Sequence, residues 1–266
     1  MKLEDLNKED LPTTEMCDIA RKHGTDKFQH GYTKVYFELM KDKRYTEISI
    51  FEIGIFKGNS LRLWHEFFPK GRVYGSDNGR LLPNSSVILG SGNQNPSEDD
   101  KRLLEENAVV ADLDFKWIEN ERIKCAIADQ RSNEQLQAAF KYFGCEKFDY
   151  IIDDAQHYQE HQQKTLGLLF ANVKPGGYYI VEDVCDYREL FQNNKYWGQK
   201  RADCTDCTDY VFEKYMKDGV LESDYMTPEQ IQYVTHNIAD IFMYDCFHRN
   251  NSPINGSARL LVLKKK

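Results

Sequence analysis

The stretch Ile50-Phe51-Glu52-Ile53-Gly54-Ile55-Phe56-Lys57-Gly58-Asn59-Ser60 joins an apolar run, Ile48–Ile55, to a loop that contains two glycines. An apolar run that enters such a loop is typical of a buried strand. The glycines allow the backbone to turn tightly and to approach a ligand closely, and the helical pattern that follows, Leu61–Phe68, offers free N–H groups at its start. Taken alone, the pattern predicts either a tight connection or a nucleotide site. It is not G-x-G-x-x-G, which disfavours a dinucleotide site, and the chain contains no P-loop motif.

The rest of the chain alternates apolar runs with helical patterns. The expected strands are Arg72–Ser76, Lys124–Ala128, Phe148–Ile152, Tyr178–Val181, Asp240–Tyr244 and Arg259–Leu263, and the expected helices include Thr14–His23, Tyr32–Met40, Asn133–Phe143 and His161–Asn172. This alternation predicts an α/β fold with a Rossmann-like, mainly parallel seven-stranded sheet and helices on both faces. The last two strands are joined by a short polar connection, so they must pair antiparallel.

Composition limits the classes of function. A chain of 266 residues suffices for one sizeable α/β domain, and 41% hydrophobic with 29% charged residues is typical of a folded globular protein. The net charge of −8, with basic residues spread along the chain, argues against binding to nucleic acid or a membrane surface. We find neither a signal-peptide core nor a window of about 18 apolar residues, so we expect a cytoplasmic protein.

The seven cysteines are odd in number and their spacing indicates no disulfide framework, so reduced thiols are expected. Cys204 and Cys207 have the spacing of metal ligands. A structural zinc site needs four ligands, and no second pair of this kind exists in the chain. Two unpaired thiols are therefore the favoured interpretation.

Acidic residues lie at the ends of five successive expected strands, and ligands of open parallel sheets bind at that edge. The strands deliver Glu52, Asp77, Asp129-Gln130, Asp153-Asp154 with His157 three residues on, and Glu182-Asp183. Each has a plainer explanation alone, since Asp77 can cap a helix and His157 can be a surface histidine. Their alignment along one edge favours a ligand site.

Four passages resemble the class I S-adenosylmethionine-dependent methyltransferases, and specifically the metal-dependent sugar O-methyltransferases of macrolide (mycinamicin-type) biosynthesis. They are HGTDKFQHGYTKVY (His23–Tyr36), FEIGIFKGNSLRLWHEFFPKGRVYGSD (Phe51–Asp77), FDYIIDDAQHYQEHQ (Phe148–Gln162) and VKPGGYYIVEDV (Val173–Val184), with IADQ (Ile127–Gln130) between them. Together they cover most of residues 20–185. The resemblance also implies a reversed last strand in the sheet.

The resemblance implies roles for individual residues. The cofactor S-adenosylmethionine would be bound by Thr25, Lys27, Tyr32, Glu52, Gly54, Gly58, Ser60, Asp77, Asp129 and Gln130, with Tyr36 in the same N-terminal segment as Thr25. Asp154, Glu182 and Asp183 would bind Mg2+ or another divalent cation, and His157 and Asp154 would be catalytic. The family has small residues, such as Gly-Ser, where this chain has Ala155-Gln156, which puts the acceptor side in doubt.

The implied chemistry is physically consistent. A sugar hydroxyl is a poor nucleophile at neutral pH, and a divalent cation held by carboxylates lowers its pKa. His157 can then accept the proton as the oxygen attacks the sulfonium methyl group. Without a cation, the three converging carboxylates would repel one another.

In domain terms, the resemblance implies a helical cap over the cofactor site in residues 1–45 and a methyltransferase domain in residues 46–266. Residues 81–107 and 186–256 are expected to be insertions or acceptor-side regions. The expected partner is a small sugar or glycoside, with nucleotide-activated sugars included, and association into homo-oligomers is common in such enzymes. Two alternatives stay open: another small acceptor, such as an amine or a phenol, and a non-catalytic subunit that only binds the cofactor.

Overall fold

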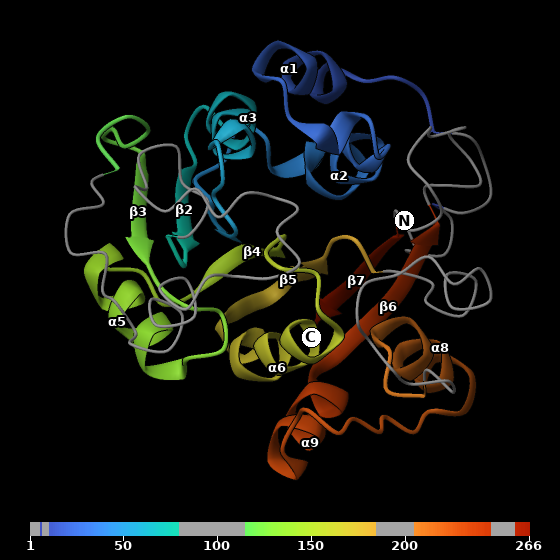
Figure 1. The fold of residues 1–266 in the computed structure, drawn as a ribbon. Coiled ribbons are helices and arrows are strands. Elements are labelled where there is room, and N and C mark those ends of the chain that lie inside the picture. Colours follow the sequence, from blue (N-terminus) through green and yellow to red (C-terminus); the bar gives the residue numbers. More distant parts are fainter. Residues whose placement is uncertain (1–5, 7–10, 80–114, 185–204, 246–258) are drawn as a thin grey trace, which may run out of the picture.

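The computed structural model describes residues 6, 11–79, 115–184, 205–245 and 259–266. Its centre is a seven-stranded sheet with strand order β3-β2-β1-β4-β5-β7-β6 (Figure 1). β7 pairs antiparallel with both β5 and β6, whereas β1 to β5 pair in parallel. The strands are β1 (Ser49–Ile53), β2 (Arg72–Asp77), β3 (Ile123–Ile127), β4 (Phe148–Asp153), β5 (Val173–Val181), β6 (Ile238–Asp245) and β7 (Arg259–Lys265).

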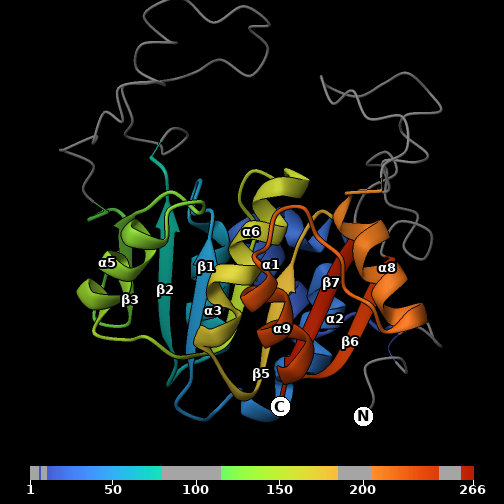
Figure 2. The same cartoon turned by 90° about the horizontal axis from the view of Figure 1, so that it is seen from below.

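Helices cover both faces of the sheet (Figures 1 and 2). One face carries α1 (Glu15–His23), α2 (Tyr32–Met40) and α3 (Asn59–Phe67), and the other carries α5 (Asn133–Phe143), α6 (Gln159–Leu169), α8 (Thr208–Asp218) and α9 (Pro228–Asn237). Short 3-10 turns occupy Asp26–Phe28, Lys41–Lys43 and Phe170–Asn172. The predicted fold class is confirmed, and the predicted elements agree with the observed ones apart from small shifts at their ends.

Two expectations need comment. The run Lys174-Pro175-Gly176-Gly177 is typical of a turn that precedes the expected strand Tyr178–Val181, but these residues lie inside β5, where the pairing with β4 is irregular. Outside the described residues lie the expected insertion at residues 81–107 and two parts of the expected region 186–256, namely 186–204 and 246–256. Residues 208–245, also assigned to the acceptor side, contain α8, α9 and strand β6 of the sheet itself. Among the described helices, none has the length and apolarity that crossing a membrane requires.

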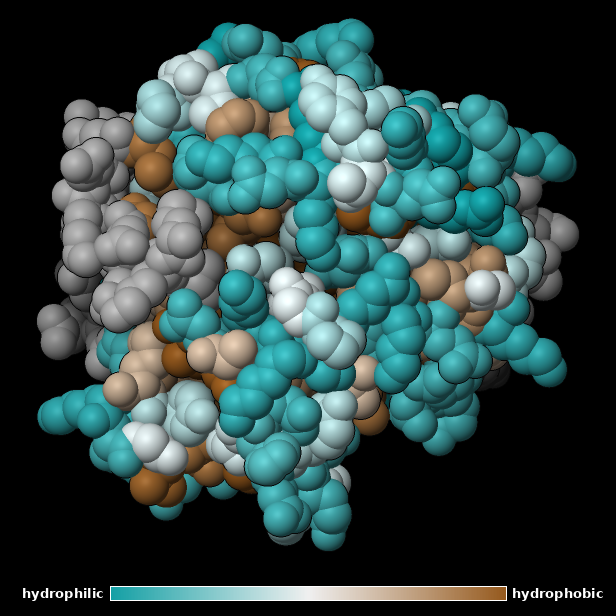
Figure 3. Space-filling model, turned by 180° about the vertical axis from the view of Figure 1, so that it is seen from behind, coloured by the Kyte–Doolittle hydropathy of each residue, from teal (hydrophilic) through white to brown (hydrophobic). Residues whose placement is uncertain are grey.

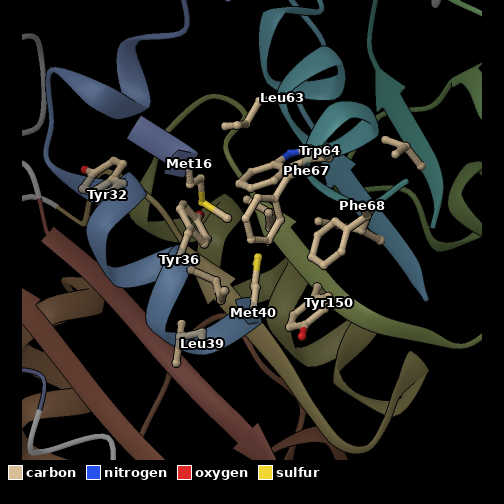
Figure 4. Packing of buried hydrophobic residues seen from close by; sticks show 14 of the residues in the cluster. Met16, Tyr32, Tyr36, Leu39, Met40, Leu63, Trp64, Phe67, Phe68 and Tyr150 are labelled. Atoms are coloured by element: carbon tan, nitrogen blue, oxygen red, sulfur yellow. The ribbon is translucent and has the colours of Figure 1, made fainter. Parts of the chain in front are cut away.

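The N-terminal helices share a hydrophobic core with the sheet. Figure 4 shows Met16, Tyr36 and Trp64 side by side above the sheet, with Tyr150 of β4 beneath them. The Tyr36 and Trp64 rings meet edge to face with their centroids 5.1 Å apart. Burial of one such side chain stabilises the fold by about 1.5–3 kcal/mol, so this core holds α1 and α2 firmly on the sheet. The far side of the molecule from Figure 1 is mainly hydrophilic, with small separate hydrophobic patches (Figure 3).

The ends of β1 and β4 come close enough to require a glycine. Gly54 follows β1 with φ 98°, and its N–H donates to the Ser76 carbonyl at 2.8 Å. A Cβ atom at Gly54 would lie 2.1 Å from the backbone oxygen of Asp154, a distance that no relaxed structure permits. The loop after β1 is therefore held directly against the residue that follows β4.

This contact predicts an unusually costly substitution. Gly54→Ala should lower the free energy of unfolding by about 3–5 kcal/mol, because it combines left-handed backbone strain with a clash against backbone. Gly176→Ala is the matched control, since Gly176 has φ 74° but open space around its Cβ position. The control should cost only about 1–2 kcal/mol. Urea denaturation followed by circular dichroism measures both values, and equal losses would contradict the close-contact explanation.

Candidate active site

A cavity of about 630 Å³ lies at the carboxyl edge of the parallel strands. Eight of the predicted site residues line it: Thr25, Gly54, Ser60, Asp77, Asp129, Gln130, Asp154 and His157. Six others do not, namely Lys27, Tyr32, Glu52, Gly58, Glu182 and Asp183. Sequence reasoning assigned no binding role to several lining residues, including Asp26, Phe56, Lys57, Asn59, Asn78 and Ala128. The predicted residues therefore divide into a cavity wall and a buried group behind it.

Asp77 organises the loop that forms one wall of the cavity. Its Oδ2 accepts the N–H groups of Ile55 and Phe56 at 2.9 and 3.2 Å, and its Oδ1 accepts the N–H of Gly79 at 2.8 Å. The side chain is nearly buried but borders the cavity. Because each carboxylate oxygen has two lone pairs, Oδ1 retains acceptor capacity for a ligand hydroxyl.

Asp129 and Gln130 lie on the wall beyond β3. The Asp129 carboxylate pairs with the Arg131 guanidinium at 2.9 and 2.6 Å, and although burial raises the Asp129 pKa, this pairing lowers it overall. Gln130 is largely buried and donates to the Thr165 hydroxyl at 3.2 Å. Both side chains are fixed before any ligand binds, which suits a preformed pocket.

Behind the cavity, the ammonium of Lys27 lies among three carboxylates. Its Nζ is 2.5 Å from Asp154 Oδ2, 2.7 Å from Glu182 Oε1 and 3.1 Å from Glu52 Oε1. The Lys27 side chain is fully buried. Burial lowers its pKa, but the negative charges of Asp154, Glu182 and Glu52 raise that pKa well above the ordinary value. Lys27 is therefore a permanent cation within the protein.

Neutral donors complete this buried group. The Tyr36 hydroxyl donates to Glu182 Oε1 at 2.5 Å, and the Trp64 indole N–H donates to Glu52 Oε2 at 2.6 Å. Burial raises the pKa of both Glu52 and Glu182. Both residues thus face the helical layer of α1 to α3 rather than the cavity. The structure does not place Glu52 where it would touch a ligand in the cavity.

A second group of charges borders the cavity. His157 Nε2 lies 3.3 Å from Asp154 Oδ1, and His157 Nδ1 lies 3.3 Å from Asp183 Oδ2. Asp183 also accepts from the Tyr32 hydroxyl at 2.5 Å and lies 3.4 Å from His30 Nδ1. Burial lowers the pKa of His157, but the hydrogen bond to Asp154 and the charges of Asp183 and Asp154 raise it to about 9. The imidazole is accordingly protonated at neutral pH.

Strained backbone is concentrated at this edge. Within the described part of the chain, the non-glycine residues with positive φ are Phe56 (43°), His157 (57°) and Asp183 (51°). They follow β1, β4 and β5, respectively. Such a conformation costs roughly 1–3 kcal/mol per residue and persists only where neighbouring contacts enforce it. Strain of this kind is typical of functional sites.

Comparison by sequence finds similarity to sugar O-methyltransferases. No protein-family model matches the chain. Mycinamicin VI 2''-O-methyltransferase of Micromonospora griseorubida is 26% identical over 179 residues, which cover 64% of this chain and 36% of the relative. Demethylmacrocin O-methyltransferase of Streptomyces fradiae is 29% identical over 179 residues, with the same coverage. A tetracenomycin-C rhamnosyl 2'-O-methyltransferase of Streptomyces olivaceus is 26% identical over 79% of this chain and 47% of the relative. The chain spans about half the length, or less, of these curated relatives.

Among solved structures, the MycE methyltransferase of mycinamycin biosynthesis, in complex with Mg, SAH and mycinamycin VI, aligns with a TM-score of 0.62. The alignment covers 96% of this chain and 55% of that chain, at 22% identity. The fold is that of a class I methyltransferase. A second MycE structure, with Mg and SAH, gives the same TM-score. In this methyltransferase fold, the cavity lies at the carboxyl edge of the parallel strands, as the sequence predicted.

Within the methyltransferase fold, the predicted metal ligands belong to two adjoining groups. Asp154, His157 and Asp183 have candidate ligand atoms within 4.8 Å of one another, and so do Glu52, Asp154 and Glu182. The first group fits a hard divalent cation, because it offers carboxylate oxygens of Asp154 and Asp183 beside a cavity. The second already surrounds the Lys27 ammonium. The assignment of Glu182 as a metal ligand stays a prediction.

Three residues of one N-terminal passage contact the acidic residues after β4 and β5. Two of them, Lys27 and Tyr32, were expected on the cofactor, and that role stays a prediction beside their contacts with Asp154, Glu182 and Asp183. His30, which no sequence argument selected, lies in the same HGTDKFQHGY passage and contacts Asp183. The passage was recognisable, but its partners lie more than 120 residues away in the chain.

The charges around His157 predict its titration. In protein freed of divalent cations, the His157 pKa should lie near 9. Because this pKa is raised above the unfolded value of about 6.5, the stabilisation is complete below that pH and is lost as pH rises through 9. Histidine-selective NMR measures the pKa, with His157→Gln for assignment. His65 is the internal control, since burial and Arg122 lower its pKa. A His157 pKa at or below 6.5 would contradict the geometry.

Proposed function

We propose that this protein transfers a methyl group from S-adenosylmethionine to a hydroxyl of a sugar or glycoside, with a divalent cation and His157 as the general base. The observation that carries the proposal is the group formed by Asp154, His157 and Asp183 beside the cavity. A protein that only binds the cofactor needs neither a base nor converging carboxylates. The named activity of the relatives supports the same reaction.

The cavity suits the methyl donor. Its volume of about 630 Å³ lies within the usual range of small-molecule sites, and the Gly54 loop is part of its lining. Asp77 offers an acceptor for ribose hydroxyls, and Asp129 with Gln130 lies on the side proposed for adenine. Thr25 and Ser60 supply further polar groups to the wall. Glu52 and Gly58 support this wall from behind, the first through Trp64 and the second at the start of α3.

His157 and the two aspartates carry the proton chemistry. A divalent cation, when bound, supplies the positive charge that lowers the pKa of the acceptor hydroxyl. Asp154 and Asp183 would hold this cation, and with their charges offset the imidazole of His157 would be available as a base. His157 takes the hydroxyl proton as the new O–C bond forms and the S–C bond of the sulfonium breaks. Asp154 and Asp183 then stabilise the imidazolium, and S-adenosylhomocysteine leaves.

The acceptor, and the partners generally, belong to the proposal. We favour a small sugar or glycoside, nucleotide-activated sugars included. Gln156, where the resembling family has a small residue, lines the cavity together with His157. A cytoplasmic location, association into homo-oligomers and the division at residue 45 stay predictions.

The decisive test is a transfer assay with labelled S-adenosylmethionine. The panel contains sugar nucleotides and glycosides, together with a catechol and a primary amine. We expect label on a sugar hydroxyl, loss of transfer in EDTA and recovery on addition of Mg2+. Transfer only to the catechol or the amine would favour the alternative acceptor class, and full activity in EDTA would contradict the metal-dependent step. No transfer to any acceptor, combined with tight cofactor binding, would favour a non-catalytic subunit.

Two substitutions should separate chemistry from binding. His157→Ala should reduce turnover by about 10²–10⁴-fold while leaving affinity for S-adenosylhomocysteine nearly unchanged. Asp77→Ala should weaken that affinity by about tenfold or more, because it removes a ligand acceptor and frees the N–H groups of Ile55 and Phe56. Calorimetry and a turnover assay measure the two effects. Unchanged turnover in His157→Ala would remove it as the base.

A further inference from the structure

We propose that Lys27 is a built-in cation that fills one half of a divided carboxylate cluster and leaves the other half open to one divalent cation. The filled half contains Glu52, Asp154 and Glu182, and the open half contains Asp154 and Asp183. The proposal deepens the proposed function, on which its account of the open half rests. Lys27 is a positioning residue, since it lies behind the cavity and does not line it.

The filled half has the geometry of a cation site. Its three carboxylate oxygens lie within 4.8 Å of one another, and Lys27 Nζ is 2.5–3.1 Å from each. Calcium ions bind oxygen ligands at about 2.3–2.6 Å, so only a small contraction would convert this arrangement into a metal site. Glu52 Oε1 is buried and has the Lys27 charge nearby, but makes no hydrogen bond within the described structure. This oxygen is directed at the position of the cation.

Asp154 belongs to both halves and uses one oxygen for each. Its Oδ2 contacts Lys27 at 2.5 Å, whereas its Oδ1 faces His157 at 3.3 Å. The ammonium therefore fixes the rotation of the carboxylate. As a result, Oδ1 is presented to the open half beside Asp183. A divalent cation in that half meets Asp154 through one defined oxygen.

Charge explains why the lysine is needed. Four carboxylates, those of Glu52, Asp154, Glu182 and Asp183, converge at the strand ends, and Glu52 and Glu182 are almost completely buried. Buried carboxylates without a compensating charge are strongly destabilising. A fixed ammonium neutralises the inaccessible half permanently. The exchangeable divalent cation is then confined to the half that borders the cavity.

The test counts the ions bound by the full chain without methyl donor or acceptor, with Mn2+ as the probe. Equilibrium dialysis and the EPR signal of free Mn2+ give the stoichiometry. Wild type should bind one ion and Lys27→Ala two, because the second group of carboxylates becomes a site. The thermal unfolding midpoint of Lys27→Ala should also rise more with Mn2+ than that of wild type. Lys174→Ala is the matched control, since it removes a lysine 2.7 Å from Asp149 at the opposite end of the sheet. It should bind one ion.

A second variant controls for the possibility that Lys27→Ala fails to fold. Lys27→Met/Glu52→Gln keeps the net charge of the cluster and removes one ligand of the filled half, so it should fold without a cation and bind one ion. A Lys27→Ala variant that folds only with Mn2+ supports the proposal. Two outcomes overturn the proposal. In the first, Lys27→Ala binds a single ion with unchanged affinity. In the second, Lys27→Ala stays unfolded at every Mn2+ concentration while the double variant folds. Wild type that binds no ion would contradict the metal in the proposed function, and a gain of one ion in Lys27→Ala would still support the role of Lys27.

Discussion

The constraint on which this structure depends is negative charge buried at the carboxyl edge of the parallel sheet. Every parallel strand of the central sheet ends there, so acidic residues at the ends of β1, β4 and β5 are forced together. The protein balances them from one short N-terminal segment, which supplies Lys27, His30 and the hydroxyls of Tyr32 and Tyr36. Charge and hydrogen bonding therefore determine where α2 must lie.

Hydrophobic packing makes this balance possible. The core beneath α1, α2 and α3 excludes water from Glu52 and Glu182, and it also fixes the backbone from which the compensating groups extend. On the opposite face, α5 and α6 pack on a separate core that includes Phe140 and Phe148. Among the described residues, the two cores lie on opposite faces of the sheet. The cavity lies at the edge where neither core closes over the strand ends.

The sequence sufficed to predict the sheet and the side of the cavity, because strand periodicity and the shared edge of parallel strands are local rules. Asp77, Asp129 and Asp154 follow directly from them. The side on which Glu52 lies follows from a local rule as well: side chains alternate along a strand, so Glu52 points with Ile50 toward the helical layer, and its role at the cofactor stays a prediction. The contacts of Lys27 could not be predicted, since they depend on how a distant helix packs. The left-handed conformations of His157 and Asp183 were not predicted either, although His and Asp adopt this region more often than most other residues.

The contact between Lys27 and Glu182 joins residues that are 155 positions apart. During synthesis, the lysine leaves the ribosome long before the strand that carries its partner has been made. Contacts of such high sequence separation form late, because closing a long loop costs entropy before the contact repays it. In the nascent chain, the Lys27 ammonium therefore stays hydrated until β5 has been synthesised. The candidate site at the carboxyl edge of the sheet can therefore form only after most of the chain has been made. Its formation is a late step of folding.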